Sequence, residues 1–257
     1  MTRGLFSTEG LAAVHGLAAH RSLLMFDLDG TLAPIVSCPG DAAVPEATAR
    51  RLRCLAQRWP VAVITGRSLA DAVDRLGFSA HYVVGNHGAE SAHGGRNNAL
   101  RLALDPCRQR LRDRDDSLHE HGIDLEDKGL SLALHYRGAL DRPAAVAWLA
   151  VLVQTLGVTV HATHGHCVVN ISPAGAKDKG DALLDIFRDC RASACLVIGD
   201  DENDEPAFIK APAGSVSVRI GSPGNPTKAR FRLASQRLVN PLLDVLLGLH
   251  HEGRQGS

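Results

Sequence analysis

The feature that most constrains the fold is an alternation of short apolar runs with helix-forming stretches, which breaks once and later resumes. Apolar, β-branched runs lie at 23–28, 61–65 and 81–85, and helical patterns at 46–59 and 68–77 separate them. Such alternation is typical of βαβ units. It predicts an α/β fold in which a Rossmann-like, doubly wound parallel sheet has helices on both faces.

The alternation breaks between about residues 100 and 176. There the order becomes a helix, two strands, a helix and two more strands, with Gly129 and Gly165 at the two expected hairpins. The first pattern then returns as a helix at 179–190 and strands at 195–199 and 215–220. We therefore expect a core built from residues 1–99 and 177–257, with an inserted α+β cap domain at 100–176.

Acidic residues follow two of the predicted core strands. Asp27 and Asp29 end the run LLMFDLDG and, on a strand, would share one face. The cluster GDDENDE at 199–205 follows the apolar run at 195–199. Acids also suit the start of a helix, but two such groups at neighbouring strand ends predict a site for a hard cation such as Mg²⁺.

Two carboxylates on one face repel each other unless a positive group lies between them. A metal ion, with a phosphoryl group beside it, would supply that positive charge. Asp27 is placed to attack phosphorus as a nucleophile and form an aspartyl-phosphate. Asp29 can protonate the leaving alkoxide and then deprotonate the attacking water. The residues alone therefore predict phosphoryl transfer.

Composition narrows the partners. Lys and Arg number 28, as do Asp and Glu, so no overall basic field favours nucleic acid or an anionic membrane. We expect a small-molecule substrate and a monomer. The first twenty residues hold no apolar run typical of a signal peptide, and the six cysteines form no CxxC pair. These features predict a cytoplasmic location.

Four motifs resemble those of the haloacid-dehalogenase superfamily: DLDGTL at 27–32, ITGR at 64–67, a Lys-Gly pair at 179–180 and GDDxxD at 199–204. The resemblance implies that Asp27 is the nucleophile, that Asp29 is the acid/base and that its backbone carbonyl is a metal ligand. Lys177 is an alternative to Lys179 as the phosphate clamp. The implied metal ligands are Asp27, Asp29, Asp200 and either Asp201 or Asp204, and the implied phosphate-binding residues are Gly30, Thr65, Gly66, Arg67 and Lys179.

Further stretches resemble the trehalose-6-phosphate phosphatase family: DGTLAPI at 29–35, GNHGAE at 85–90, EDKG at 126–129 and HYR at 135–137. Asn170 stands where that family's pattern has Glu, which leaves room for an altered sugar. The implied sugar contacts are His87, Glu90, Glu126, Lys128, His135, Arg137 and Asn170.

Several alternatives stay open. Glu126 and Lys128 could form an exposed ion pair instead of a sugar site. The run HATHGH at 161–166 could suggest zinc. Another glycoside phosphate is a possible substrate, a phosphomutase is a possible enzyme, and a non-catalytic sugar-phosphate sensor is a possible function of another class.

Overall fold

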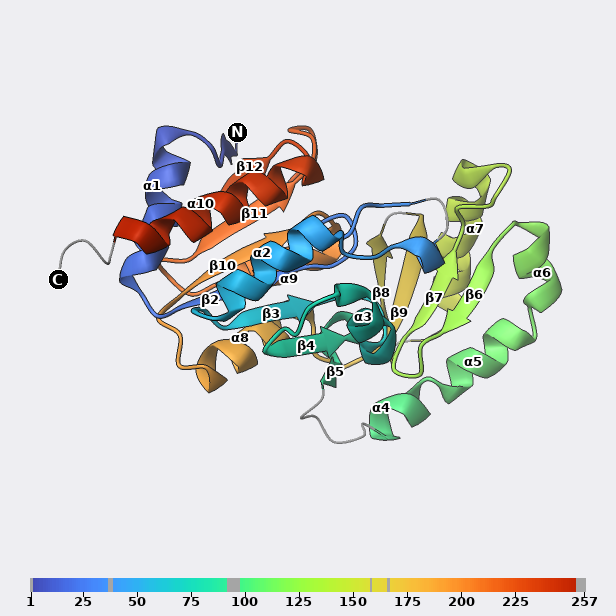
Figure 1. Ribbon diagram of the computed structural model, residues 1–257. Coiled ribbons are helices and arrows are strands. Elements are labelled where there is room, and N and C mark those ends of the chain that lie inside the picture. The colour runs from blue at the N-terminus through green and yellow to red at the C-terminus, as the bar shows by residue number, and fades with distance from the viewer. Residues whose placement is uncertain (1, 37–38, 92–97, 158, 166, 253–257) are drawn as a thin grey trace. The chain divides into compact units, whose positions relative to one another are not determined.

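The computed structural model describes residues 2–36, 39–91, 98–157, 159–165 and 167–252 (Figure 1). The chain divides into two compact units, one formed by Met1–Ala92 with Lys177–Ser257 and the other by His93–Ala176. The expected boundary between residues 99 and 100 cuts a helix, α4 (Asn98–Ala103). The first boundary therefore lies earlier in the chain than the sequence pattern suggests.

The first unit contains an eight-stranded sheet in the order β1-β12-β11-β10-β2-β3-β4-β5. All neighbours are parallel except β4 and β5, which are antiparallel. The strands are β1 (Arg3–Gly4), β2 (Ser22–Phe26), β3 (Val61–Ile64), β4 (Tyr82–Gly85), β5 (Glu90–Ser91), β10 (Ala194–Gly199), β11 (Val216–Ile220) and β12 (Phe231–Leu233).

Helices cover both faces of this sheet. Those of the first unit are α1 (Thr8–Gly16), α2 (Glu46–Ala56), α3 (Leu69–Leu76), α8 (Lys179–Asp189), α9 (Glu205–Lys210) and α10 (Val239–Glu252), and short 3₁₀ helices lie at η1 (Leu17–Ala19), η2 (Pro39–Asp41), η3 (Asn86–Gly88), η4 (Glu202–Asp204) and η5 (Gln236–Leu238).

The alternation of side chains along β2 shows why its sequence is apolar throughout. Leu24 and Phe26 pack in one core with residues of α1, α2, α3 and α10. Leu23 and Met25 point the other way and pack with residues of α8 and α9. A strand buried on both faces needs apolar residues at every position. The predicted doubly wound sheet is confirmed.

The second unit is an antiparallel sheet with helices packed on one face. Its strand order is β6-β7-β9-β8. Leu132, Leu134, Val169 and Ile171 form a core with helix residues such as Leu149. The elements are α4, α5 (Asp105–Arg112), α6 (Asp115–Glu120), β6 (Asp124–Asp127), β7 (Leu132–His135), α7 (Arg142–Thr155), β8 (Val160–Gly165) and β9 (Val168–Pro173). The predicted order of elements in this segment is confirmed.

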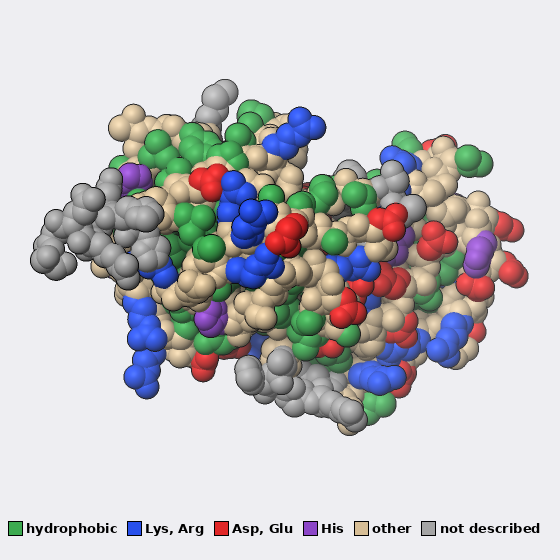
Figure 2. Space-filling model, in the orientation of Figure 1, with side chains coloured by type: hydrophobic (Ala, Val, Ile, Leu, Met, Phe, Trp, Pro, Cys, Tyr) green, Lys and Arg blue, Asp and Glu red, His purple; other side chains and the backbone are tan. Residues whose placement is uncertain are grey.

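Two properties bear on possible partners. Among the described residues, none of the helices combines the length and apolar character needed to cross a membrane. Figure 2 shows basic and acidic side chains intermixed on the visible face, in keeping with equal numbers of the two.

Candidate active site

The motifs predicted to carry chemistry follow neighbouring parallel strands of the first unit. β10, β2, β3 and β4 lie side by side in the sheet. The residues that directly follow them are Asp200, Asp27, Thr65 and Asn86. Because the carboxyl ends of parallel strands meet at one edge of a sheet, these residues are gathered at that edge.

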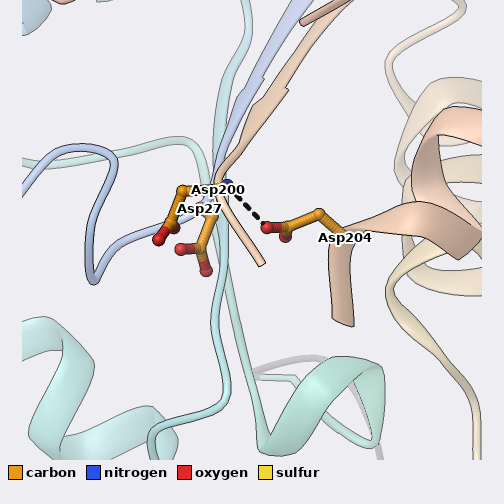
Figure 3. A group of neighbouring side chains, drawn as sticks. All are labelled: Asp27, Asp200 and Asp204. Carbon is orange, nitrogen blue, oxygen red and sulfur yellow. Dashed lines mark hydrogen bonds between the residues drawn. The ribbon is translucent and has the colours of Figure 1, made fainter. Parts of the chain in front are cut away.

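Three aspartates form a close group there (Figure 3). Asp27, Asp200 and Asp204 each offer a carboxylate oxygen, and these oxygens lie within 4.8 Å of one another. Asp27 is 5% exposed and Asp204 only 1%. Across the part of the chain that the structure describes, no other cluster of His, Cys, Asp and Glu has this geometry, so the exposed His161 and His164 of β8 join none. His166 lies outside the described residues.

Asp204 organises the acidic loop. Its Oδ2 accepts hydrogen bonds from the backbone N–H groups of Asp200 and Asp201, each at 2.9 Å. A Cβ at Gly199 would lie 2.1 Å from the Asp204 carboxyl carbon, so only glycine fits there. Asp201 turns its own carboxylate to the backbone N–H of Glu202 at 2.7 Å. The acid that joins Asp27 and Asp200 is therefore Asp204, while Asp201 caps the short helix η4.

Lys179 connects two of the three aspartates. Its Nζ lies 2.5 Å from Asp27 Oδ1 and 2.7 Å from Asp204 Oδ1, and its side chain is 3% exposed. Burial by itself would lower the pKa of Lys179, but the two carboxylates outweigh it and raise the pKa above its usual value. Lys177, the alternative clamp, is exposed and pairs with Asp185. Lys179 is thus the lysine that lies beside Asp27, and its role as the phosphate clamp stays a prediction.

The charges of the group leave room for a cation. Burial, opposed by Lys179 and reinforced by the charges of Asp204 and Asp200, raises the pKa of Asp27 well above its ordinary value. Burial, with the charges of Asp204 and Asp201, raises the pKa of Asp200 to about 7. One lysine does not balance three clustered carboxylates, two of which are buried. This oxygen-only donor set fits a hard divalent ion such as Mg²⁺.

Gly30 lets the turn after β2 approach the carboxylate of Asp200 closely. Its φ of +82° is one that a side chain disfavours, and a Cβ there would lie 2.1 Å from Asp200 Oδ2. Its backbone N–H closes the turn by donating to the carbonyl of Ala33 at 2.8 Å. Thr31 reaches the same carboxylate, with Oγ1 3.4 Å from Asp200 Oδ1. The turn after β2 is thus shaped around Asp200.

Asp29 has a different environment from the one expected. Because β2 ends at Phe26, both Asp27 and Asp29 lie beyond the strand, and the argument that they share a strand face does not apply. The Asp29 carboxylate is instead held by the fork of Arg67, with Nε 2.6 Å from Oδ2 and Nη2 2.7 Å from Oδ1. Its side chain is absent from the group formed by the other aspartates.

Arg67, expected at the phosphate, is also fixed by α3. Its Nη1 donates to Asp71 Oδ2 at 2.7 Å. Hydrogen bonds from Arg75 and then from Arg67 lower the pKa of Asp71 to about 2, against the opposing effect of burial. In this structure Arg67 therefore orients the predicted acid/base, Asp29.

Thr65 and Gly66 make a close turn beside the β4 loop. Thr65 is 1% exposed, and its Oγ1 accepts from the backbone N–H of Arg67 at 3.2 Å. The Thr65 carbonyl accepts from the backbone N–H of His87 at 2.9 Å. A Cβ at Gly66 would lie 2.4 Å from the His87 ring, so glycine is needed where the two loops meet. Thr65, Gly66 and His87 are thus brought together, as the motifs suggest.

Glu90, an expected sugar contact, already has partners within the loop. Its Oε2 accepts from Asn86 Nδ2 at 2.7 Å and from the backbone N–H of Leu69 at 2.8 Å. Leu69 is the first residue of α3. Glu90 therefore ties the β4 loop to the start of that helix.

The other expected sugar contacts lie in the second unit. Glu126 Oε2 is 2.9 Å from His135 Nε2 and 3.6 Å from Lys128 Nζ, so the considered ion pair of Glu126 and Lys128 is present. Asn170 is 3% exposed and lies opposite Ala133 on β7, which is itself opposite Glu126. Arg137 follows β7, and its carbonyl accepts from Arg142.

Two basic residues near the site escape prediction from sequence. Lys210, the last residue of α9, lies 2.9 and 2.8 Å from the oxygens of Asp178 and 2.7 Å from Asp181, at the start of α8. Arg219 of β11 donates to the carbonyl of Asp201 and is 3.1 Å from Glu205. Each residue contacts an element well removed from it in the sequence. No local sequence pattern therefore predicts these contacts.

Known proteins resemble this chain in sequence. A family model described as trehalose-phosphatase matches residues 25–237. The chain is 37% identical over 250 residues to a trehalose-phosphate phosphatase of Mycobacterium marinum, an alignment that covers 90% of this chain and 63% of that protein. The chain thus spans less than two thirds of that relative's length.

Solved structures share the fold. The C-terminal domain of Candida albicans trehalose-6-phosphate phosphatase matches with a TM-score of 0.79 at 22% identity, covering 96% of this chain and 98% of that one. The C-terminal domain of a Candida albicans trehalose synthase regulatory protein matches with a TM-score of 0.67 at 14% identity, covering 88% and 93%. The family match over most of the chain decides its affiliation. This chain belongs to the trehalose-phosphatase family.

Proposed function

We propose that the protein is a phosphatase that hydrolyses trehalose 6-phosphate to trehalose and phosphate. The observation that carries the proposal is the close group of Asp27, Asp200 and Asp204 with the buried Lys179 at the carboxyl edge of a parallel sheet. Membership of the trehalose-phosphatase family supports the choice of substrate. The relative from Mycobacterium marinum is likewise named a trehalose-phosphate phosphatase.

In the proposed first step, Asp27 attacks phosphorus. Lys179 binds Asp27 Oδ1 at 2.5 Å and so leaves Oδ2 as the attacking oxygen. A bond forms between Asp27 and phosphorus as the bond from phosphorus to the sugar oxygen breaks. Asp29 gives a proton to the departing sugar oxygen. Trehalose leaves, and the phosphoryl group stays on Asp27.

In the second step, Asp29 takes a proton from a water molecule that attacks the same phosphorus. The bond to Asp27 breaks, inorganic phosphate leaves, and Asp29 again carries the proton. Both oxygens of Asp29 are held by Arg67 in this structure. The fork uses one lone pair of each oxygen, so each keeps a second lone pair that can carry the transferred proton. Arg67 thus orients the carboxyl group for both of its roles.

The phosphoryl oxygens need positive charge and N–H donors. The Thr65 hydroxyl, Gly66 and Lys179 are the proposed donors, since Thr65 and Gly66 follow β3 at the sheet edge and Lys179 already contacts the nucleophile. Gly30 is also expected there, but its backbone N–H is donated to the Ala33 carbonyl in this structure. Such fixed donors stabilise charge as it develops in the transition state.

Mg²⁺ is the proposed cofactor. When bound, it would neutralise charge on the phosphoryl oxygens and on the carboxylates around it. Asp27 and Asp200 would hold it, together with the backbone carbonyl of Asp29. Asp204 accepts N–H groups on both oxygens, so it is proposed mainly to orient Asp200 and Lys179. Asp201 caps η4 and is a weaker candidate.

The second unit is proposed as the substrate-specificity cap. Glu126, Lys128 and His135 meet on the sheet face opposite its apolar core, and Asn170 belongs to the same face by its register. These charged and amide groups suit the hydroxyls of a disaccharide. Arg137 is a proposed contact of the same kind, as are His87 and Glu90 of the first unit. Monomeric state, cytoplasmic location and absence of nucleic-acid or membrane partners stay predictions.

The test is phosphate release from trehalose 6-phosphate, with and without Mg²⁺, beside glucose 6-phosphate and sucrose 6-phosphate. We expect release that depends on metal and strongly favours the trehalose ester, with Asp27→Asn as the inactive blank. Equal rates on all esters would refute trehalose 6-phosphate as the specific substrate. Release from a different ester alone would identify that ester as the substrate instead. No release from any ester would favour the sensor alternative.

A further inference from the structure

The hairpin that carries Glu126 and Lys128 has a second, non-sugar face. β6 and β7 pair in antiparallel register, and the backbone N–H of Lys128 closes the turn by donating to the Ser131 carbonyl at 3.0 Å. Side chains alternate along this segment, so Asp127 points away from the face of Glu126 and Lys128. A group that holds Asp127 therefore also restrains the backbone between Glu126 and Lys128.

Arg108 of α5 holds this opposite face. Its Nε lies 2.8 Å from Asp127 Oδ2, and its Nη2 lies 3.2 Å from Asp127 Oδ1 and 2.6 Å from the Gly129 carbonyl. Its Nη1 donates to Asp105 at 2.8 Å and to the Arg101 carbonyl at 2.7 Å. The N–H donors of the guanidinium are thus all used.

The same contacts define the turn. Asp127 Oδ1 accepts from the backbone N–H of Gly129 at 2.9 Å, and Gly129 has a φ of +83°. Arg108 therefore grips both Asp127 and the carbonyl of Gly129, one on each side of Lys128 in the sequence. Although charged, Arg108 is only 8% exposed, and such burial is rare for arginine unless it is fully paired.

We infer that Arg108 is a positioning residue for sugar recognition, which holds Glu126 and Lys128 in place through Asp127 and Gly129. The inference rests on the proposed function, in which those two side chains contact the sugar. Hydrogen bonds to sugar hydroxyls require placement within about 0.5 Å, and a shift of about 1 Å can cost a hundredfold in rate. A phosphate ester without the sugar would not sense the shift.

The test compares trehalose 6-phosphate with p-nitrophenyl phosphate, which shares the reacting phosphoryl group but lacks the disaccharide. Arg108→Met removes all the contacts, and Arg108→Lys keeps a charge but loses the fork. Asp127→Asn weakens the same link from the hairpin side. Arg112→Met, at an exposed position on the same helix, is the matched control.

We expect Arg108→Met and Arg108→Lys to raise KM for trehalose 6-phosphate about tenfold or more. Turnover of p-nitrophenyl phosphate should stay within about twofold of wild type, which also shows that each variant folds. Asp127→Asn should shift the ratio of the two activities in the same direction, with little further loss in the double variant. Arg112→Met should match wild type.

Two results would overturn the inference, and they are distinguishable. If wild type hydrolyses trehalose 6-phosphate but Arg108→Met leaves its KM unchanged, or lowers both activities equally, Arg108 does not position the sugar-reading side chains. If wild type releases no phosphate from trehalose 6-phosphate, the proposed function is refuted, and the inference, which depends on it, is refuted as well.

Discussion

Replacing Lys179 with methionine should destabilise the protein as well as inactivate it. The side chain is 3% exposed and contacts Asp27 and Asp204, so its loss leaves two buried carboxylates without their cation. Breaking a buried ion pair from one side costs about 3–5 kcal/mol. Proton uptake by Asp27 would relieve the repulsion. In the unfolded state Asp27 is an ordinary carboxyl with a pKa about three units below neutral pH. Measured against that state, the proton uptake limits the loss of stability to about 4 kcal/mol, because each pKa unit is worth about 1.36 kcal/mol.

The assay is equilibrium urea unfolding in EDTA, which removes any metal. We expect the free energy of unfolding of Lys179→Met to fall by about 3–5 kcal/mol at neutral pH. The deficit should shrink as the pH falls, because Lys179 lowers the pKa of Asp27 against the effect of burial. Without Lys179 the pKa of Asp27 in the folded state rises further, so protonation stabilises the variant more than the wild type.

The matched control is Lys177→Met. Lys177 is two residues away, but it is exposed and its partner Asp185 is partly exposed. Its removal should change the free energy of unfolding by less than about 1 kcal/mol. If Lys179→Met were as stable as this control, or if its deficit grew at low pH, the buried cluster would not have the energetics described here.

Three further predictions concern the surroundings of the site. Gly30→Ala should weaken Mg²⁺ binding, measured by calorimetry, about tenfold or more, because its Cβ would meet Asp200. Gly77→Ala is the control, since that glycine also has a positive φ but no contact closer than 3.6 Å, and equal Mg²⁺ affinity in the two variants would refute the steric argument. Asp71, whose pKa is lowered to about 2, should stabilise the fold fully above about pH 4 and lose that effect as the pH falls toward 2; thermal unfolding of Asp71→Asn should converge on wild type over that range, and a constant difference would contradict it. Lys210→Met should lower kcat for trehalose 6-phosphate and p-nitrophenyl phosphate alike, because it frees the start of α8 without touching the sugar; an effect on the sugar ester alone would exclude this role.

The sequence predicts the core sheet well because its signals are local and strong. The runs at 61–65 and 81–85 need apolar residues on both faces, and β3 and β4 fall within them. The outer strands β1 and β12 carry no such signal. Arg3–Gly4 and Phe231–Leu233 are too short for a periodic pattern. They form strands because β12 pairs with β11 and β1 then pairs with β12.

The candidate site also has features that the sequence predicts and features that it does not. The order of the motifs and the parallel topology place Asp27, Thr65, Lys179 and Asp200 at one edge, so their convergence is predictable. The partners of individual side chains are not. Arg67 reaches Asp29 across a gap of 38 positions in the sequence, and the difference between Asp201 and Asp204 depends on which carboxylate folds back onto the loop backbone.

The central claim is that Asp27 carries the phosphoryl group during hydrolysis of a sugar phosphate. The most direct test is mass spectrometry of peptides from the enzyme, quenched in acid during turnover of trehalose 6-phosphate, with phosphate release followed in parallel. The account predicts a phosphoryl group on the peptide that contains Asp27, and neither this adduct nor phosphate release in Asp27→Asn. Phosphate release by Asp27→Asn at the wild-type rate would contradict it.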